Sequence, residues 1–272
     1  MIPLRLLTVL PLALVLSNCS ALKKDAAEAS AGPVKVPTVA NTSYRGPSYA
    51  MPSARNPNVN LPSNISGVSG VSHSRGAVTH PYIAMTFDDG PHPRNTPRLL
   101  DMLRQRNIKA TFYVIGENVE RYPSIARRIV AEGHEIGNHT WTHANLTKLS
   151  DASVRKEMTR TRSIIVSTTG VKPRTMRPPY GALLTRQRQM IYNEFGYPTI
   201  MWSVDPRDWQ RPGVSVVRDR ILSGTNNGAI VLAHDLHAPT VDAMPGTLDG
   251  LLNKGFKFVT VSQLLALKGA AQ

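Results

Sequence analysis

The sequence predicts an α/β domain built on parallel strands, because short apolar runs alternate with longer amphipathic segments after residue 80. We expect strands at Tyr82–Phe87, Ala110–Val114, Glu135–Asn138, Thr175–Arg177, Thr199–Val204, Ala229–His234 and Phe256–Thr260. We expect helices near Thr96–Arg106, Tyr122–Glu132, Asp151–Thr169, Leu184–Phe195, Ser215–Leu222, Ala238–Asn253 and Ser262–Leu267. This alternation fits an open sheet or a barrel. Seven units in 192 residues are too few and too short for a full eight-fold barrel, which needs about 250 residues.

Local signals support some of these helix boundaries. Pro97 suits the first turn of a helix, where a backbone N–H is not required. Ser150 and Ser262 suit the N-cap position, because their hydroxyls can accept a backbone N–H of the first turn.

The composition limits the class of protein. The 272 residues are 41% apolar and 18% charged, which is enough for a folded core. The single Cys excludes an internal disulfide framework and a Cys-based zinc site. Lys and Arg number 32 against 18 Asp and Glu, so the formal charge of +14 favours anionic surroundings. With only 6% aromatic residues, a base-stacking nucleic-acid site is not expected.

The first 19 residues have the pattern of a targeting segment. Arg5 precedes an apolar run of about a dozen residues, which is shorter than the about 20 that span a bilayer. The sole Cys follows in Leu16-Ser17-Asn18-Cys19, which resembles a bacterial lipobox, the motif in which the Cys is lipidated. Asn18 departs from the small residue usual before that Cys, so simple export is an alternative, and an uncleaved apolar tail is another. We expect a lipoprotein in the cell envelope, membrane-anchored and facing the periplasm or cell wall, with no nucleic-acid partner.

Residues 20–80 have the composition of a disordered linker. These 61 residues include 10 Ser, 6 Pro, 5 Asn and 5 Gly, with no Phe or Trp and no helical apolar period. Such a segment buries too little apolar surface to offset its chain entropy. We therefore expect a signal peptide at 1–19, a linker at 20–80 and one folded domain at 81–272. That domain is itself basic, with 25 Lys and Arg against 16 Asp and Glu.

Reactive side chains lie at or just after the C-terminal ends of five predicted strands. They are Asp88 and Asp89, His139, Arg177, Asp205 and His234. Active sites of parallel barrels and sheets gather at this edge. Chance would not place all of these residues there, so the pattern favours an enzyme.

Two of these segments offer metal ligands. His139 and His143 are four residues apart, and two imidazoles at that spacing can reach one cation from a helix or a tight loop. A carboxylate from Asp88 or Asp89 completes a set of two His and one carboxylate, as hydrolytic zinc sites have. The other carboxylate is then free to act as a base. The plain alternatives are an acidic turn and a chance pair of His residues.

The remaining segments have both a functional and a plain interpretation. Arg177 can orient and ionise a buried Asp, although Pro178-Pro179-Tyr180-Gly181 is also good turn chemistry. His234 ends a buried strand, where a lone imidazole is often only a packed, hydrogen-bonded residue. Trp209 fits a core position as well as a site position.

Together, five segments resemble in order and spacing the five motifs of the NodB-homology polysaccharide deacetylases, carbohydrate esterase family 4. They are Thr86–Pro91 (TFDDGP), His139–His143 (HTWTH), Arg177–Tyr180 (RPPY), Asp205–Trp209 (DPRDW) and Leu232–His234 (LAH). The match extends from Pro81 to Ala266, and no motif is broken. The resemblance implies a distorted (β/α)-barrel with about seven parallel strands and hydrolysis of N-acetyl groups on a sugar polymer. The alternative within the family is a pseudoenzyme that only binds sugar.

The resemblance also implies a metal site and a base. Asp89, His139 and His143 would be the ligands of a divalent metal, with Zn²⁺ the expected ion and Co²⁺ or Ni²⁺ compatible with the same donors. Asp88 would be the general base, and Arg177 would orient it.

Five further residues receive roles from the resemblance. His234 would be the general acid, kept protonated by Asp208. The backbone N–H of Tyr180 would complete the oxyanion site. Trp209 and Leu232 would shape the acetyl pocket.

The polymer is less defined than the reaction. Export and a long linker would bring the domain to the cell wall, so we expect a monomer that deacetylates N-acetylglucosamine or N-acetylmuramic acid of peptidoglycan, an anionic polymer. Chitin or chitooligosaccharides are the second candidate, and acetylated xylan is the third. A non-catalytic wall-binding lipoprotein would use the charge and the linker but would leave the five motifs unexplained.

Overall fold

The computed structural model describes residues 55–57, 61, 63–65, 68 and 70–267. The predicted signal peptide, the predicted lipidation site Cys19 and much of the predicted linker lie outside these residues. Over the described part of the chain, no helix is long and apolar enough to cross a membrane.

The centre of the domain is strand β2 (Tyr82–Asp88), which is buried along almost its whole length. It pairs in parallel with β3 (Thr111–Val114), β6 (Ile230–Val231) and β7 (Lys257–Phe258). In turn β3 pairs in parallel with β4 (Glu135–Asn138). Parallel strands covered on both sides carry near-continuous apolar runs, and β2 has this pattern up to the carboxylate at its end.

Isolated bridges extend this sheet toward a closed ring. Met176 bridges Asn138 at the end of β4 and Thr199 in β5 (Thr199–Ile200), and Val204 bridges Val231 in β6. The result is an irregular parallel barrel, which confirms the predicted fold class. The strand expected at Thr175–Arg177 is reduced to the bridge at Met176, because Pro173 and Pro178 flank it and have no N–H to donate.

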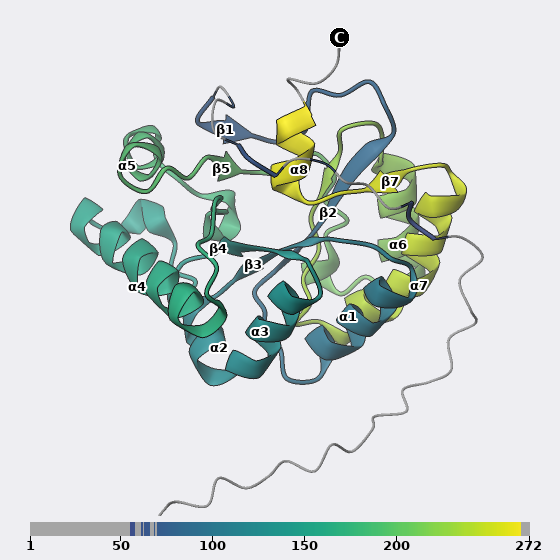
Figure 1. Ribbon diagram of the computed structural model, residues 1–272, viewed down its shortest axis with the longest axis horizontal. Coiled ribbons are helices and arrows are strands. Elements are labelled where there is room, and N and C mark those ends of the chain that lie inside the picture. Colours follow the sequence, from purple (N-terminus) through teal and green to yellow (C-terminus); the bar gives the residue numbers. More distant parts are fainter. Residues whose placement is uncertain (1–54, 58–60, 62, 66–67, 69, 268–272) are drawn as a thin grey trace, which may run out of the picture. The chain divides into compact units, whose positions relative to one another are not determined.

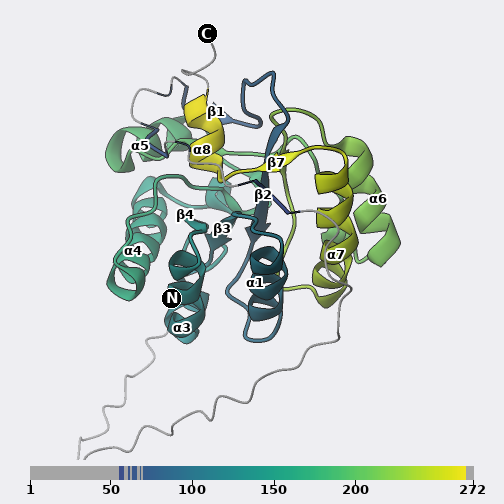
Figure 2. The ribbon, with the colours of Figure 1, turned by 45° about the vertical axis from the view of Figure 1, so that its right-hand side comes forward.

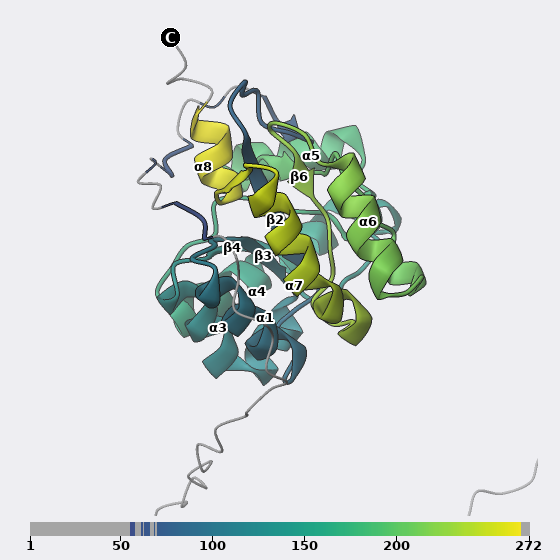
Figure 3. The same ribbon diagram turned by 90° about the vertical axis from the view of Figure 1, so that its right-hand side faces the viewer.

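Helices surround the strands (Figures 1 and 2). They are α1 (Asn95–Gln105), α2 (Gly116–Arg121), α3 (Pro123–Ala131), α4 (Asp151–Thr169), α5 (Thr185–Phe195), α6 (Val214–Gly224), α7 (Ala238–Asn253) and α8 (Val261–Ala266). Figure 3 shows α6 and α7 packed side by side. The short helix α2 was not among the expected helices, and three 3₁₀ turns lie at Leu146–Lys148, Pro179–Gly181 and Asp208–Gln210.

The two expected N-caps have different outcomes. Ser150 caps α4, and its hydroxyl accepts the N–H of Ser153 at 3.2 Å. The expectation for Ser262 is wrong, because Thr260 caps α8 through a reciprocal pair of hydrogen bonds with Gln263. The Ser262 hydroxyl instead donates to Glu135 at 2.7 Å.

The predicted boundary at His80 is also wrong, because residues before it belong to the domain. Strand β1 (Ser72–His73) pairs in parallel with β5. Asn56 is 5% exposed and pairs with the backbone of Phe258 in β7. Its Nδ2 donates to the carbonyl of Phe258 at 3.0 Å, and its Oδ1 accepts the N–H of the same residue at 2.7 Å. A side-chain amide thus completes the edge of β7 as a neighbouring strand would.

This contact gives a stability prediction. Asn56→Ala leaves two buried backbone groups of Phe258 without partners, so the free energy of unfolding should fall by about 2–4 kcal/mol. Urea denaturation measures this change. Asn193→Ala is the matched control, because that side chain is exposed and bonds only to Gln189 one helical turn away. Equal stability of the two variants would mean that residue 56 contributes nothing to the fold.

Candidate active site

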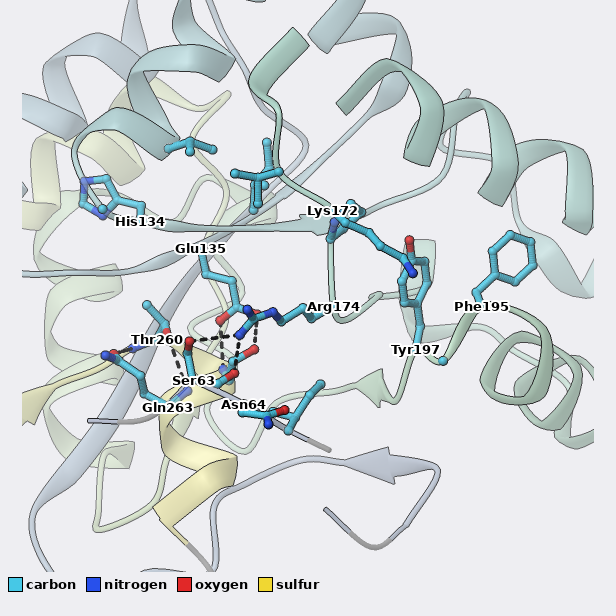
Figure 4. A pocket seen from close by; sticks show the side chains of 18 residues that line it. Ser63, Asn64, His134, Glu135, Lys172, Arg174, Phe195, Tyr197, Thr260 and Gln263 are labelled. Carbon is cyan, nitrogen blue, oxygen red and sulfur yellow. Dashed lines mark hydrogen bonds between the residues drawn. The ribbon is translucent and has the colours of Figure 1, made fainter. Parts of the chain in front are cut away.

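Cavities lie at both ends of the barrel. One of about 730 Å³ lies at the N-terminal ends of the strands and is lined by none of the predicted site residues (Figure 4). Two of its central charged side chains are already paired, since Glu135 accepts from Ser262 and Arg174 donates to Ser63. We therefore place the candidate active site at the other end.

The cavity at the C-terminal ends of the strands is about 400 Å³ in volume. Eight predicted site residues line it: Asp88, Asp89, His139, His143, Tyr180, Trp209, Leu232 and His234. The other two, Arg177 and Asp208, are buried and bond to residues of the lining. The structure therefore brings the ten predicted site residues of the described chain together.

Asp89, His139 and His143 form a cluster suited to a cation. The Oδ1 of Asp89 lies 3.3 Å from Nε2 of His139 and 3.1 Å from Nε2 of His143. The Nδ1 of His139 lies 2.7 Å from the carbonyl of Arg177, so the proton belongs on Nδ1 and Nε2 offers a lone pair. Although it is buried, Oδ1 of Asp89 accepts no hydrogen bond from the described residues. Three electron-pair donors that face one point fit a divalent cation.

The electrostatics of this cluster also favour a bound cation. Burial raises the pKa of Asp89, but the imidazoles of His139 and His143 outweigh burial and leave it below its usual range. Burial lowers the pKa of His139, but Asp88 and then Asp89 outweigh burial and raise it. Two carboxylates thus attract positive charge to this point, and a bound cation would supply it.

Asp88 lies next to the cluster, with one carboxylate oxygen 3.8 Å from Nε2 of His139, and its other oxygen is bound by a buried arginine. The Nη1 of Arg177 donates to Oδ1 of Asp88 at 2.8 Å and to the hydroxyl of Thr86 at 2.6 Å. Both charged side chains are almost fully buried. Because Arg177 remains charged at any ordinary pH, it stabilises Asp88 as a carboxylate.

The buried carboxylate of Asp208 forms a hydrogen bond with the imidazole of His234. The Nδ1 of His234 lies 2.8 Å from Oδ1 of Asp208. The other oxygen of Asp208, Oδ2, accepts hydrogen bonds from the backbone N–H of His234 and from the hydroxyl of Thr240. Burial lowers the pKa of His234, but the hydrogen bond and charge of Asp208 outweigh it, so the pKa rises to about 9. The imidazole is therefore protonated at neutral pH.

The remaining predicted residues form the walls. Leu232 is buried, while the side chains of Tyr180 and Trp209 are 69% and 52% exposed at the cavity mouth. Tyr180 has φ 60°, and its backbone N–H has no hydrogen-bond partner among the described residues. Asp205 also lines the cavity and accepts the N–H of Arg207 at 2.8 Å, which shapes the turn that leads to Asp208.

Glu157, which the sequence does not predict as a site residue, supports the loop between the two histidines. This carboxylate on α4 accepts the backbone N–H groups of Trp141 and Thr142 at 2.8 and 2.9 Å and the Thr142 hydroxyl at 3.1 Å. The loop needs this support because Thr140 and His143 have φ of 68° and 59°, in the left-handed region. No pattern within α4 distinguishes Glu157 from a solvated helix carboxylate.

The sequence does not predict Asp235 as a site residue either. It is fully buried directly after His234, and its carboxylate accepts a hydrogen bond from the hydroxyl of Thr96. Burial raises the pKa of Asp235 to about 7, and the negative charge of Asp89 adds to this effect. The hydrogen bond from Thr96 lowers the pKa but does not offset burial. Its neighbour His237 lines the active-site cavity.

A two-His, one-carboxylate cluster, an ionised carboxylate beside it and a protonated imidazole share one cavity at the C-terminal end of a parallel barrel. This combination defines the class of metal-dependent hydrolases, which need a Lewis acid, a base and an acid around one bond.

Comparison with known proteins gives the family. The family model described as polysaccharide deacetylase matches residues 75–200. The chain is 42% identical over 192 residues to the peptidoglycan-N-acetylglucosamine deacetylase PgdA of Listeria monocytogenes, an alignment that covers 71% of this chain and 40% of that protein. It is 40% identical over 197 residues to a chitooligosaccharide deacetylase of Bradyrhizobium sp., covering 67% of this chain and 90% of the relative. The chain thus spans two fifths of the length of the Listeria protein.

A solved structure agrees with this family. A crystal structure of a peptidoglycan N-acetylglucosamine deacetylase bound to a naphthyl N-oxidanyl-benzamide is 36% identical, with a TM-score of 0.67, and the match covers 70% of this chain and 91% of that chain. The chain belongs to the polysaccharide deacetylase family, carbohydrate esterase family 4, and the resemblance seen in its five motifs is confirmed.

Glu157 provides a prediction for metal binding. Glu157→Ala removes three acceptor contacts from the loop that carries His143, so we expect metal affinity to fall by about 10-fold or more. Titration against a chelator of known affinity measures it without reference to activity. Glu120→Ala, an exposed carboxylate on α2, is the control. Unchanged affinity in Glu157→Ala would show that the loop holds its conformation without the carboxylate.

Proposed function

We propose that this protein is a metal-dependent deacetylase of peptidoglycan, which removes N-acetyl groups from its N-acetylglucosamine or N-acetylmuramic acid residues. The observation that carries this proposal is the cavity shared by the Asp89, His139 and His143 cluster, Asp88 and protonated His234. The substrate is supported by the name of the Listeria relative and by the basic character of the domain. Zinc is the proposed ion, because imidazole and carboxylate donors in a three-ligand site are typical of catalytic zinc, although Co²⁺ and Ni²⁺ suit the same donors.

Each residue has a defined task in this hydrolysis. A divalent cation held by Asp89, His139 and His143 supplies Lewis acidity toward the acetyl carbonyl and toward water. Asp88, kept ionised and oriented by Arg177, accepts the proton of the attacking water.

The remaining steps use the other side of the site. The free N–H of Tyr180 donates to the carbonyl oxygen as negative charge develops on it. His234 gives its Nε2 proton to the amide nitrogen as the C–N bond breaks, so the products are acetate and a free amine. The proton is needed because an unprotonated amide nitrogen is a poor leaving group.

The second candidate substrate is a chitooligosaccharide, which the name of the Bradyrhizobium relative favours. Acetate release from purified peptidoglycan and from chitin oligomers compares the two. The proposal requires acetate from peptidoglycan, and release from chitin oligomers alone would replace it with the second candidate.

We also propose that the protein is exported, lipidated at Cys19 and active as a monomer in the cell envelope. The support is the targeting pattern of residues 1–19 and a substrate that lies outside the cytoplasm. Cys19→Ser should move the protein from the membrane fraction to the soluble envelope fraction. Wild-type protein already soluble after osmotic shock would contradict lipidation.

Substitution of Asp89 should remove metal binding, whereas substitution of its neighbour Asp88 should remove turnover. His139→Ala or Asp89→Asn should abolish tight metal binding, because each removes one of three protein donors. Asp88→Asn should keep the metal and lower kcat by about 100- to 10,000-fold, as removal of a general base does. Metal content by elemental analysis and turnover are measured on the same preparations. Loss of metal from Asp88→Asn with retention in Asp89→Asn would reverse the two assignments.

The raised pKa of His234 predicts the pH dependence. A general acid works only when protonated, so kcat/KM should hold through neutral pH and fall as the pH passes about 9. Asp208→Asn removes the charge that raises the pKa of His234, so this fall should move to lower pH while metal content stays unchanged. A pH profile of kcat/KM for both proteins measures the displacement. If the profile of Asp208→Asn coincides with that of the wild type, the falling limb belongs to another group.

A further inference from the structure

A second cavity of about 400 Å³ adjoins the active-site cavity. Asp89 and His143 line both cavities and so form the wall between them. The other walls are the turn after β2, with His92, and the segment where α2 passes into α3, with Arg121 and Tyr122. Because the two cavities share Asp89 and His143, the second cavity lies directly beside the Asp89, His139 and His143 cluster.

The lining of the second cavity offers donors. Arg121 is exposed, and its guanidinium has no partner among the described residues. His92 is used differently, since its Nδ1 accepts the backbone N–H groups of Arg94 and Asn95 at 3.3 and 3.1 Å. Burial and then the charge of Arg94 lower the pKa of His92, so the ring is neutral and carries its proton on Nε2.

One acidic residue lines the described part of this cavity, and the exposed carboxylates of Glu117 and Glu120 on α2 lie outside the lining. Asp89 is the only acidic residue in the described lining, and its Oδ1 faces the two imidazoles instead. Arg94 adds a second exposed cation beside His92. The cavity therefore presents one free guanidinium and a neutral N–H, which are donors that recognise a carboxylate.

We propose that this second cavity binds the carboxylate-bearing substituent of the sugar next to the one that loses its acetyl group, with Arg121 as its main contact. The inference rests on the proposed function and sharpens it. In peptidoglycan every second sugar carries an acid-bearing substituent, whereas chitin has none. Arg121 would thus select the acidic polymer and direct the reaction to the neutral sugar beside the acidic one.

The test compares three probes of similar length. They are a peptidoglycan tetrasaccharide with free carboxylates, the same fragment with its carboxylates converted to methylamides, and chitotetraose. The readout is the ratio of kcat/KM between the acidic and the amidated fragment. In the wild type this ratio should favour the acidic fragment, and added salt should reduce it because the contact is exposed. Arg121→Gln should lower the ratio by about 10-fold, the loss expected for one charge-assisted hydrogen bond.

Two further variants separate charge from structure. Arg121→Lys keeps the charge without the fork of donors, so it should retain part of the preference. Arg127→Gln on α3 removes an exposed arginine that lines neither cavity, and it should leave the ratio unchanged. Arg121 also stands in the last turn of α2, where a cation stabilises the helix, and thermal unfolding of each variant measures that contribution.

The outcomes distinguish this inference from the proposed function. If Arg121→Gln lowers kcat/KM equally on the acidic and amidated fragments, or if the wild type does not prefer the acidic one, the inference is overturned while peptidoglycan deacetylation stands. If the wild type releases acetate only from chitotetraose, the proposed substrate fails and the inference fails with it. A loss confined to the acidic fragment supports both.

Discussion

The candidate site depends on the buried ion pair between the guanidinium of Arg177 and the carboxylate of Asp88. The guanidinium donates to Asp88 and Thr86 on β2 and to two backbone carbonyls at the end of β5, so it joins opposite parts of the barrel. Leaving a buried charge without its partner costs about 3–5 kcal/mol, and this cost keeps Asp88 and Arg177 in one arrangement. The carbonyl of Arg177 also accepts Nδ1–H of His139. One residue therefore fixes both the orientation of Asp88, the proposed base, and the tautomer of His139, a proposed metal ligand.

The division of labour between Asp88 and Asp89 follows from the backbone. Two consecutive strand residues would point in opposite directions, and β2 ends at Asp88. Asp89 has φ 76°, which turns its carboxylate toward the imidazoles while that of Asp88 stays on Arg177. Asn118 donates to the carbonyl of Asp89 at 2.8 Å and supports this left-handed conformation. Chemically identical neighbours thus meet an arginine in one case and two imidazoles in the other.

The fold class, six of the seven strand positions and the gathering of the reactive residues could be predicted, because parallel strands leave a periodic apolar signal and share one functional edge. The barrel wall at Met176 could not, since it consists of one bridge between prolines. Asn56 and Glu157 could not either. Each bonds to backbone of a distant segment, over 202 residues in the case of Asn56 and Phe258, and such pairing leaves no periodicity in the sequence.

The segments that carry Asp88, the proposed base, and His234, the proposed acid, contact each other at two places. The N–H of Asp88 donates at 2.9 Å to the carbonyl of Ala233, the residue before His234. Asp235, the residue after His234, accepts a hydrogen bond from the hydroxyl of Thr96. Its carboxylate also packs on Gly90, two residues after Asp88, so closely that a Cβ at position 90 would lie 2.4 Å from it. Glycine is required at position 90 for this reason. Because the two segments contact each other twice, the barrel itself sets the spacing between Asp88 and His234. The proposed selection among sugar polymers would then depend on residues outside this frame, on the turns and short helices that border Asp89 and His143.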